Sequence, residues 1–292
     1  MQQLVNTALG GLTLGAVYAA FALALVLIFR STRIVNFAQA PMAMVTTFIA
    51  LTLIDAGYSY WIGFAAALLS GLVLGAVIER VVIRPVEDKP EINAVILTLG
   101  LFITLHALAA VIFGNRFRSF PAPFGLRGLE VGGTTIRLTT SGIFTIVAVA
   151  TVMVLLLLLF RYTDVGLRMR ASAYNPEVAR LLGGRVGRML TLGWALAAVV
   201  GSLSGLLIAS GGLVHPGYMD SIVVYGFVAA VLGGLESPVG AVVGGLTLGL
   251  SLSFVSGYLG SELVALAALL ILMLVLTLKP GGLFAVASAR RV

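Results

Sequence analysis

Residues 4–29 read LVNTALGGLTLGAVYAAFALALVLIF, a mainly apolar run without a charged side chain. A helix needs about 20 such residues to cross a hydrocarbon core of about 30 Å, so this run is long enough to span a membrane. The rest of the chain has the same character, because 60% of its 292 residues are hydrophobic and only 10% are charged. Soluble domains carry about 25% charged residues. The composition therefore predicts an integral membrane protein.

Further apolar segments of similar length follow the first one. The stretch Ile222–Gly257 is too long for one span and is interrupted by GGLESP at 233–238, so we interpret it as a short segment (222–235) and a full one (239–257). Lipid offers no partner for free backbone groups, so each segment is expected to be helical. The sequence predicts an all-α, polytopic bundle of eight or nine hydrophobic segments, one of them broken or re-entrant, in a single transmembrane domain over 1–292. The other expected spans are Phe37–Ile54, Trp61–Ile83, Ile92–Phe113, Ser141–Phe160, Met189–Ser210 and Leu263–Leu278.

Basic residues lie in the connections between these segments, a pattern that orients membrane proteins and gives no reason to expect nucleic-acid binding. With the N-terminus outside and nine crossings, the positive-inside rule places most of them in the cytoplasm. They follow the first and third spans, fill the loop 161–188 and close the chain at Lys279, Arg290 and Arg291. One long external loop holds Arg116, Arg118, Arg127 and Arg137. We expect a multi-pass protein of a bacterial inner membrane, in contact with membrane lipid.

The sequence lacks the residues that several kinds of catalysis and metal binding require. The chain has no cysteine and no GxxxxGK[ST] phosphate-binding loop, since both of its lysines precede proline. Its two histidines, His106 and His215, are too far apart to suggest a zinc site. A Gly-x-Ser-x-Gly nucleophile motif is also missing. We therefore expect neither an enzyme nor a cofactor, and any energy from ATP must come from a partner.

Few ionisable residues fall inside the apolar segments. His106 lies well inside one of them, either as a neutral histidine bonded to a backbone carbonyl or hydroxyl, or as part of a proton relay. Glu236 lies at the break of the late segment, which is either a pair of half-helices that bind polar groups of a substrate or a tight hairpin. Ion-coupled transporters carry such groups at mid-membrane. Their scarcity makes an ion-coupled secondary transporter the weaker alternative.

Asn36 and Gln39 open the second apolar segment just before Pro41. One interpretation is a helix cap. The other is an irregular segment inside the bundle that lines a substrate path, because non-helical backbone at membrane depth must face protein or water. Pairs of small residues four apart predict tight helix contacts, some of which could slide during a transport cycle. These pairs are Gly11 and Gly15, Gly71 and Gly75, Gly201 and Gly205, Gly240 and Gly244, and Gly245 and Gly249.

The loop 161–188 contains the signals of a short helix. Asn175 suits the N-cap, Pro176 and Glu177 suit the first turn, and Gly183 suits the stop. Ala179 and Leu182 would then form a small apolar face. The loop is either an interfacial helix held by anionic lipid or a docking element for a cytoplasmic partner.

Five stretches in order resemble one family. They are GLTLGAVYA at 11–19, RIVNFA at 33–38, GLRMRASA at 166–173, VAAVLGGLESPVGA at 228–241 and KPGGLF at 279–284. Together they resemble the LivH-type inner-membrane permeases of branched-chain amino acid ABC transporters. Each stretch alone is weak, but the set covers nearly the whole chain.

The resemblance implies a transport subunit for branched-chain or related small amino acids, with urea, short amides or other small solutes as the alternative cargo. It implies four partner subunits of three kinds: a second, LivM-like permease, two cytoplasmic ATPases and a periplasmic solute-binding protein. On this hypothesis the ATPase coupling loop includes Arg168, Arg170, Asn175, Glu177, Ala179 and Gly183. The candidate substrate path includes Asn36, Gln39, His106 and Glu236. A membrane scaffold without transport is a further alternative.

Overall fold

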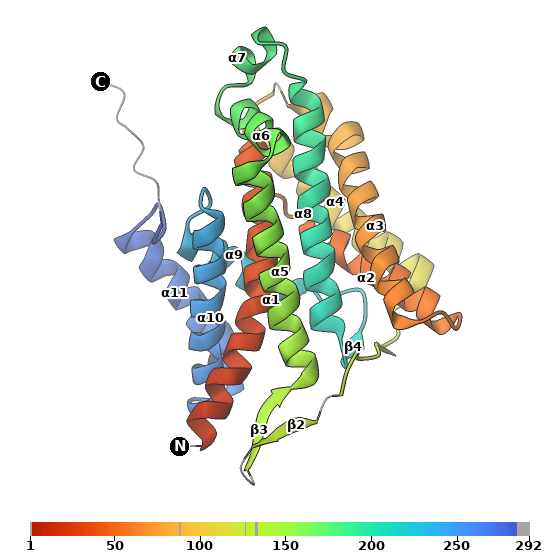
Figure 1. Ribbon diagram of the computed structural model, residues 1–292, viewed down its shortest axis with the longest axis vertical. Helices are drawn as coiled ribbons and strands as arrows, with labels where there is room; N and C mark the ends of the chain where they lie inside the picture. Colours follow the sequence, from red (N-terminus) through yellow and green to blue (C-terminus); the bar gives the residue numbers. More distant parts are fainter. Residues whose placement is uncertain (1, 88, 126, 132–133, 285–292) are drawn as a thin grey trace.

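The computed structural model describes residues 2–87, 89–125, 127–131 and 134–284, and this part of the chain folds as a helix bundle (Figure 1). Seven helical segments in it are long and apolar enough to cross a membrane. This confirms the predicted all-α polytopic class, and the helix bounds lie within a few residues of the predicted segments. They are α1 (Gln2–Thr32), α3 (Tyr60–Ile78) with η1 (Glu79–Ile83) and η2 (Arg84–Val86), α4 (Glu91–Phe113), α5 (Thr140–Tyr162), α8 (Val186–Ala209), α10 (Pro238–Tyr258), and α11 (Val264–Leu278) with η3 (Ser261–Leu263).

Two apolar helices are shorter, α2 (Gln39–Asp55) with 17 residues and α9 (Asp220–Gly233) with 14. At about 1.5 Å per residue neither reaches across a hydrocarbon core of about 30 Å. A non-helical segment precedes each of them: 33–38, which is irregular, before α2, and 210–219, which includes a two-residue strand, before α9. The predicted break in Ile222–Gly257 is confirmed, because α9 ends at Gly233 and α10 begins at Pro238.

The connections that the charge pattern placed in the cytoplasm meet at one end of the bundle, which we call the basic end. Arg33, after α1, forms an ion pair with Glu236 in the turn between α9 and α10. Arg180 lies 3.5 Å from Glu87 of the connection after η2. Two short helices of the loop 161–188, α6 (Asp164–Tyr174) and α7 (Pro176–Leu181), also lie there (Figure 1). Arg290 and Arg291 of the predicted C-terminal cluster lie outside the described residues.

The opposite end, which we call the ribbon end, carries short antiparallel strands that the sequence did not predict. Strand β1 (Arg118–Ser119) pairs with β4 (Leu213–Val214), and β2 (Gly128–Val131) pairs with β3 (Thr134–Thr139). Asp55, which ends α2, forms an ion pair with Arg118. The chain therefore passes from the basic end at Arg33 to the ribbon end at Asp55 through the segment that contains α2.

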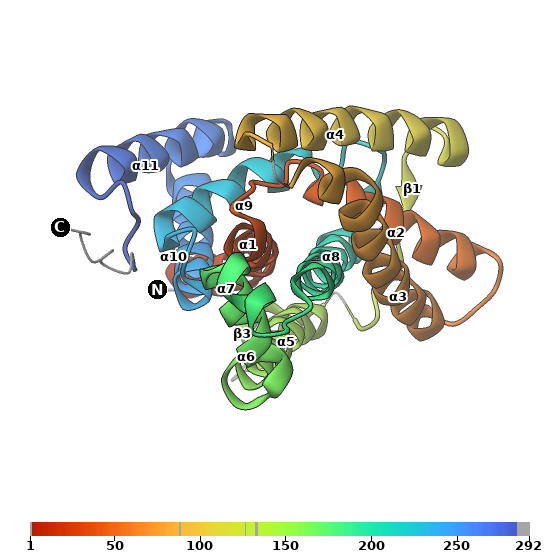
Figure 2. The ribbon, with the colours of Figure 1, turned by 90° about the horizontal axis from the view of Figure 1, so that it is seen from above.

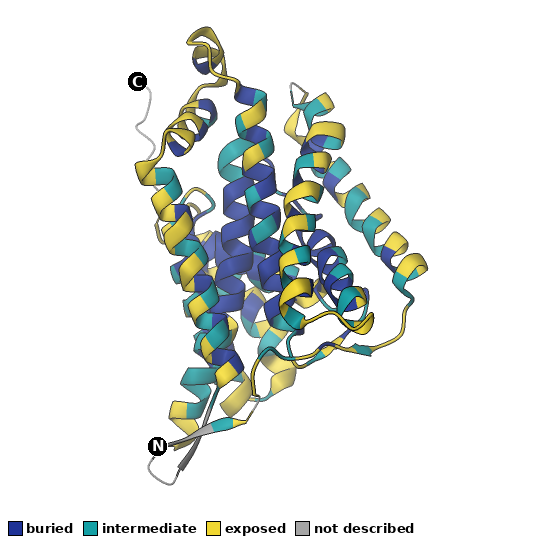
Figure 3. Cartoon of the chain, turned by 45° about the vertical axis from the view of Figure 1, so that its right-hand side comes forward, coloured by how far each residue is buried: buried dark blue, intermediate teal, exposed yellow. Residues whose placement is uncertain are grey.

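Helices α1 and α8 lie in the middle of the bundle, between α5 on one face and α4 and α11 on the other (Figure 2). The most apolar window of α1 is 78% buried, whereas those of α4 and α11 are each 11% buried. Exposed apolar side chains cover the outer helices, while the buried residues gather in the centre (Figure 3). This distribution fits a protein whose outer surface is solvated by lipid.

Small residues bring several helices into backbone contact, as the spacing predicted. A Cβ atom on Gly11 would lie 2.9 Å from the Cα of Leu250, and one on Gly75 would lie 2.6 Å from the carbonyl oxygen of Trp194. The first contact belongs to the seam between α1 and α10, and the second to the seam between α3 and α8. The other predicted pairs also lie at helix contacts, with Gly201 and Gly205 facing α2, Gly240 and Gly244 facing α9, and Gly245 and Gly249 facing α1.

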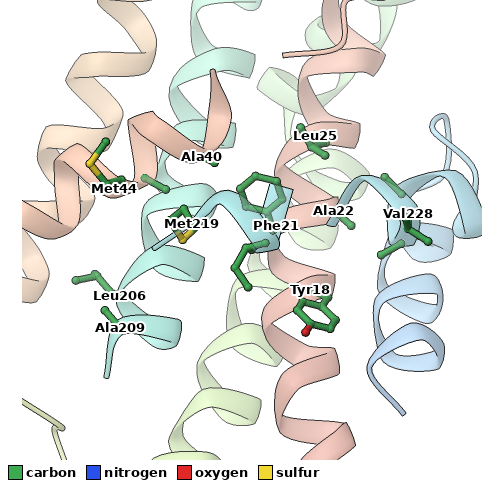
Figure 4. Close-up of a cluster of buried hydrophobic side chains, with 14 of the residues drawn as sticks. Tyr18, Phe21, Ala22, Leu25, Ala40, Met44, Leu206, Ala209, Met219 and Val228 are labelled. Atoms are coloured by element: carbon green, nitrogen blue, oxygen red, sulfur yellow. The ribbon is translucent and has the colours of Figure 1, made fainter. Parts of the chain in front are cut away.

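A cluster of buried side chains joins α1, α2, α8 and α9 around the fully buried ring of Phe21 (Figure 4). Met44 comes from α2, Leu206 from α8, and Met219 from the residue before α9. Gly226 lies against Phe21 so closely that a Cβ there would overlap the ring. The two short helices are therefore anchored to the central pair rather than placed at the periphery.

Candidate functional site

The segment that contains Asn36 is irregular backbone enclosed by the bundle. Helix α1 ends where Arg33 adopts a positive φ of 59°, and the Arg33 amide donates to the Phe29 carbonyl at 2.8 Å. This is the left-handed cap that glycine usually provides. The Asn36 Oδ1 accepts from the Ala38 amide at 3.0 Å, which holds the turn into α2. Of the two expected features, the structure has the non-helical segment inside the protein. The N-cap of α2 is Ala38, without a side-chain capping bond, and Asn36 instead forms a turn just before the helix.

Asn36 and Gln39 are in contact and are each only 1% exposed. The Asn36 Nδ2 donates to the Gln39 Oε1 at 3.2 Å, and the Gln39 Nε2 donates to the Ala197 carbonyl of α8 at 3.0 Å. A Cβ on Gly201 would occupy the place of the Gln39 amide nitrogen. Gly201 is therefore needed to admit this buried amide, which ties the start of α2 to the middle of α8.

Further polar contacts continue this link along α2 and α8. The Thr46 Oγ1 lies 2.9 Å from the Ser202 Oγ, and the Tyr218 hydroxyl lies 2.8 Å from the Thr47 Oγ1. We call Gln39, Thr46, Thr47, Ser202 and Tyr218 the polar row. Such bonds satisfy groups that lipid could not. The polar row ties the start of α2, through Gln39, and the segment before α9, through Tyr218, to the central helix α8.

His106 lies on α4, away from the polar row. Its Nδ1 is 3.1 Å from the Phe102 carbonyl and its Nε2 is 3.1 Å from the Asp220 Oδ1. The contact with the Phe102 carbonyl matches one of the two alternatives from the sequence, a histidine bonded to a backbone carbonyl. The contact with Asp220, which the sequence did not suggest, joins α4 to the first turn of α9.

Glu236 lies in the turn between α9 and α10, at the basic end. Its side chain is 49% exposed and is paired with Arg33. Both residues line a cavity of about 440 Å³ together with Arg170 and with apolar side chains of α1, α5, α6 and α8. Of the four candidate path residues, the structure brings together Asn36 and Gln39, and places His106 and Glu236 at separate sites.

The loop 161–188 folds as two helices where the sequence indicated one. Thr163 caps α6 by accepting from the Gly166 amide at 3.1 Å. Asn175 caps α7 by accepting from the Val178 amide at 3.0 Å, and Gly183 follows α7 with a φ of 80°. The start and stop predicted for the short helix are thereby confirmed.

The side chains of this loop divide into an anchored set and an exposed set. Ala179 is buried against Val186 and Leu190 of α8, as expected for its apolar face. Leu182 follows the last residue of α7 and is 83% exposed, so it does not share the buried position of Ala179. The exposed set contains Arg168, Arg170, Asn175, Glu177, Leu181, Leu182 and Gly183.

Residues 7–278 match the protein family described as the permease component of the branched-chain amino acid transport system. The chain belongs to this permease family. The permease is 30% identical to the high-affinity branched-chain amino acid transport permease LivH of Salmonella typhimurium, over 97% of this chain and 94% of that one. LivH of Escherichia coli K12 is equally similar over the same shares. BraD of Pseudomonas aeruginosa is 29% identical over 97% of this chain and 95% of that one.

The fold of the permease also resembles that of a solved structure. PsaBC from Streptococcus pneumoniae, in complex with Fab, superposes with a TM-score of 0.53 at 17% identity, covering 96% of this chain and 93% of that one. The permease is thus a multi-pass inner-membrane component of an ABC transporter.

A second link in the permease joins the loop 161–188 to α3, and sequence reasoning missed it. Glu79 is 1% exposed, and its carboxylate accepts from Arg84 at 2.8 Å and from Thr191 of α8 at 2.8 Å. Arg84 also donates to the Gly187 carbonyl at 2.6 Å. The acid Glu79, close to arginines at the end of an apolar segment, was a sequence signal for an ion pair. The bond to Thr191 could not be predicted, because Thr191 comes from a distant part of the chain.

Proposed function

We propose that the permease is the membrane-spanning subunit of an ATP-driven importer of branched-chain or related small amino acids, delivered by a periplasmic binding protein. The observation that carries this proposal is the family match over 7–278, together with 30% identity over 97% of the chain to a relative named for branched-chain amino acid transport. The match includes the irregular segments around α2 and α9 as well as the loop 161–188.

The chain lacks a motif for ATP hydrolysis, so the proposed importer takes its energy from partner subunits. The sequence has no phosphate-binding loop, and its described residues contain no cluster of acids and histidines that could hold a metal ion. Two ATPase partners at the basic end would supply the work, with a second, LivM-like permease completing the passage. The exposed set of the loop 161–188 supports this placement, because Leu181 is 87% exposed at the end where the ATPases would dock. A large apolar side chain held in this way is suited to a partner's groove.

The proposed path runs beside the irregular segments. Asn36 and Gln39 would line its middle, with His106 toward the ribbon end and the Glu236 cavity at the basic end. An amino acid carries one positive and one negative group, and the Glu236 cavity offers a carboxylate and arginines beside apolar walls. The polar row would have to rearrange for passage, because Gln39 is buried and hydrogen-bonded to Asn36 and to α8 in this conformation.

The test is uptake in cells that lack the gene, with and without a plasmid copy. Radiolabelled leucine should accumulate only with the plasmid, and accumulation should stop when ATP is depleted but persist when a protonophore collapses the ion gradient. Radiolabelled urea is the comparison cargo. Unchanged leucine uptake in the deletion strain would exclude leucine as a substrate of this permease. Accumulation that follows the ion gradient rather than ATP would support a secondary transporter.

A further inference from the structure

An apolar groove runs between α5 and α10 near the basic end, with α1 as its floor. Helix α1 is visible between these two helices in Figure 1. The groove encloses about 380 Å³. Leu157 of α5 and Val239 of α10 line its rim and are 49% and 58% exposed, so the groove opens sideways on the outer surface. That surface is where lipid lies in a membrane-spanning bundle.

Three arginines line the groove, with the carboxylate of Glu236 near them. Arg30 comes from α1, Arg161 from the end of α5, and Arg170 from α6. The ion pairs among the described residues include none of these three arginines, and Glu236, whose charge also attracts Arg30, forms its ion pair with Arg33. The charge of Arg30 is repelled by those of Arg170 and Arg33 and attracted by that of Glu236. Arg30 is half-buried, whereas Arg161 and Arg170 are exposed. Positive charges gathered beside an apolar wall favour a counter-anion, most of all for the half-buried Arg30.

We propose that this groove binds an anionic phospholipid of the leaflet at the basic end, with its phosphate between Arg30, Arg161 and Arg170 and an acyl chain along the apolar floor. Arginine binds phosphate oxygens through paired N–H groups. Basic pockets between helices at the cytoplasmic face are suited to anionic headgroups. The aliphatic wall, which includes Leu23, Leu27 and Val242, selects a lipid over a free anion.

The position of the site gives the lipid a role. Its three arginines connect the core helix α1, the outer helix α5 and the helix α6 of the loop 161–188. A bound phosphate would neutralise the repulsion between Arg30 and Arg170 and would hold α6 against the end of α1. The lipid would therefore stabilise the loop in the orientation seen here.

The test measures lipid retention by the full-length permease, purified with the subunits that accompany it. The protein is incubated with equal amounts of phosphatidylglycerol and phosphatidylcholine, and bound lipids are counted by native mass spectrometry. Arg161→Gln should lower the preference for phosphatidylglycerol by about fivefold, the factor expected for one basic residue at a membrane surface. Arg161→Lys keeps the charge and should retain most of the preference. Arg80→Gln, at an exposed arginine of the same end, should leave it unchanged.

A second variant tests the groove without changing charge. Val239→Trp should fill the rim and lower the binding of phosphatidylglycerol, while thermal unfolding reports whether the protein remains folded. Equal retention of both lipids by the unmodified permease would overturn the proposal. So would full displacement of the lipid by inorganic phosphate, or crosslinking from Leu157→Cys to a second permease subunit that covers the groove.

Discussion

At the scale of single residues, a glycine on α8 makes room for the buried amide group of Gln39. Gly201 leaves the space in which the Gln39 amide reaches the Ala197 carbonyl. The same helix face carries Gly205, where a Cβ would lie 2.9 Å from the Thr47 Oγ1. The contacts of α2 with α8 thus depend on glycine for close approach and on amide or hydroxyl groups for bonding.

Gly201→Val should destabilise the permease, because the new side chain must displace Gln39 from a buried site. Overpacking of this kind costs about 1–3 kcal/mol. Thermal unfolding in detergent measures the loss. Gly100→Val is the matched control, since Gly100 lies mid-helix on exposed α4 with no atom within 4 Å of its added Cβ. Equal melting temperatures for the two variants would contradict the proposed role of Gly201.

Glu79→Gln should also lower the stability, because it leaves Arg84 without its buried anion at the junction of α3 and α8. Hydrogen bonds to charged groups contribute about 1.5–3 kcal/mol each. Denaturation followed by tryptophan fluorescence suits the measurement, since Trp194 lies on α8 near Thr191. Glu91→Gln, an exposed acid at the start of α4, serves as the control and should change little.

At the scale of elements, apolar length and helix caps could be read from the sequence. The long segments became helices, and Asn175 and Gly183 bound α7 as their residue types indicated. Helix α6 was not expected, because its run of charged and small residues is far less hydrophobic than the membrane spans. Its Thr163 cap is recognised only from the contact with the Gly166 amide. The pairing of β1 with β4 joins residues about a hundred positions apart, which local patterns do not report.

The exposed set of the loop 161–188 should behave as a docking surface. Arg168→Glu, and separately Leu181→Asp, should reduce ATPase association by about 30-fold, the change that corresponds to about 2 kcal/mol at an interface residue. Copurification of tagged permease with its ATPases measures this, and membrane content confirms that the variants are folded. Arg116→Glu, exposed at the ribbon end, is the charge-matched control. Normal association of both loop variants would exclude the docking role.

At the scale of the whole molecule, the structure separates a basic end from a ribbon end. The grouping of the basic connections at one end could be predicted from their positions between apolar segments. The candidate site could be predicted only in part. Asn36 and Gln39 were identified because polar residues at the start of an apolar segment are uncommon, whereas Thr191, Ser202 and Tyr218 are ordinary in helices and loops. Their importance depends on neighbours from distant segments.

The permease by itself should not concentrate a solute. Reconstituted alone into vesicles with an imposed proton or sodium gradient, it should accumulate no leucine, because the described residues place one histidine–aspartate contact and no acid–base chain along the bundle. Reconstitution with its ATPases and binding protein, with ATP supplied on the ATPase side, should restore accumulation. Gradient-driven accumulation by the isolated chain would refute the division of labour proposed above.

The seam between α1 and α10 has a mechanical consequence. Gly11, Gly15, Gly245 and Gly249 leave almost no side chain between the two backbones, so neither helix can bend without the other. We expect the two helices to move together as one rigid body. A small rotation of the turn at Glu236 would then displace the opposite ends of α1 and α10 by a similar amount. A force applied on one side of the bilayer can therefore change the protein surface that faces the other side.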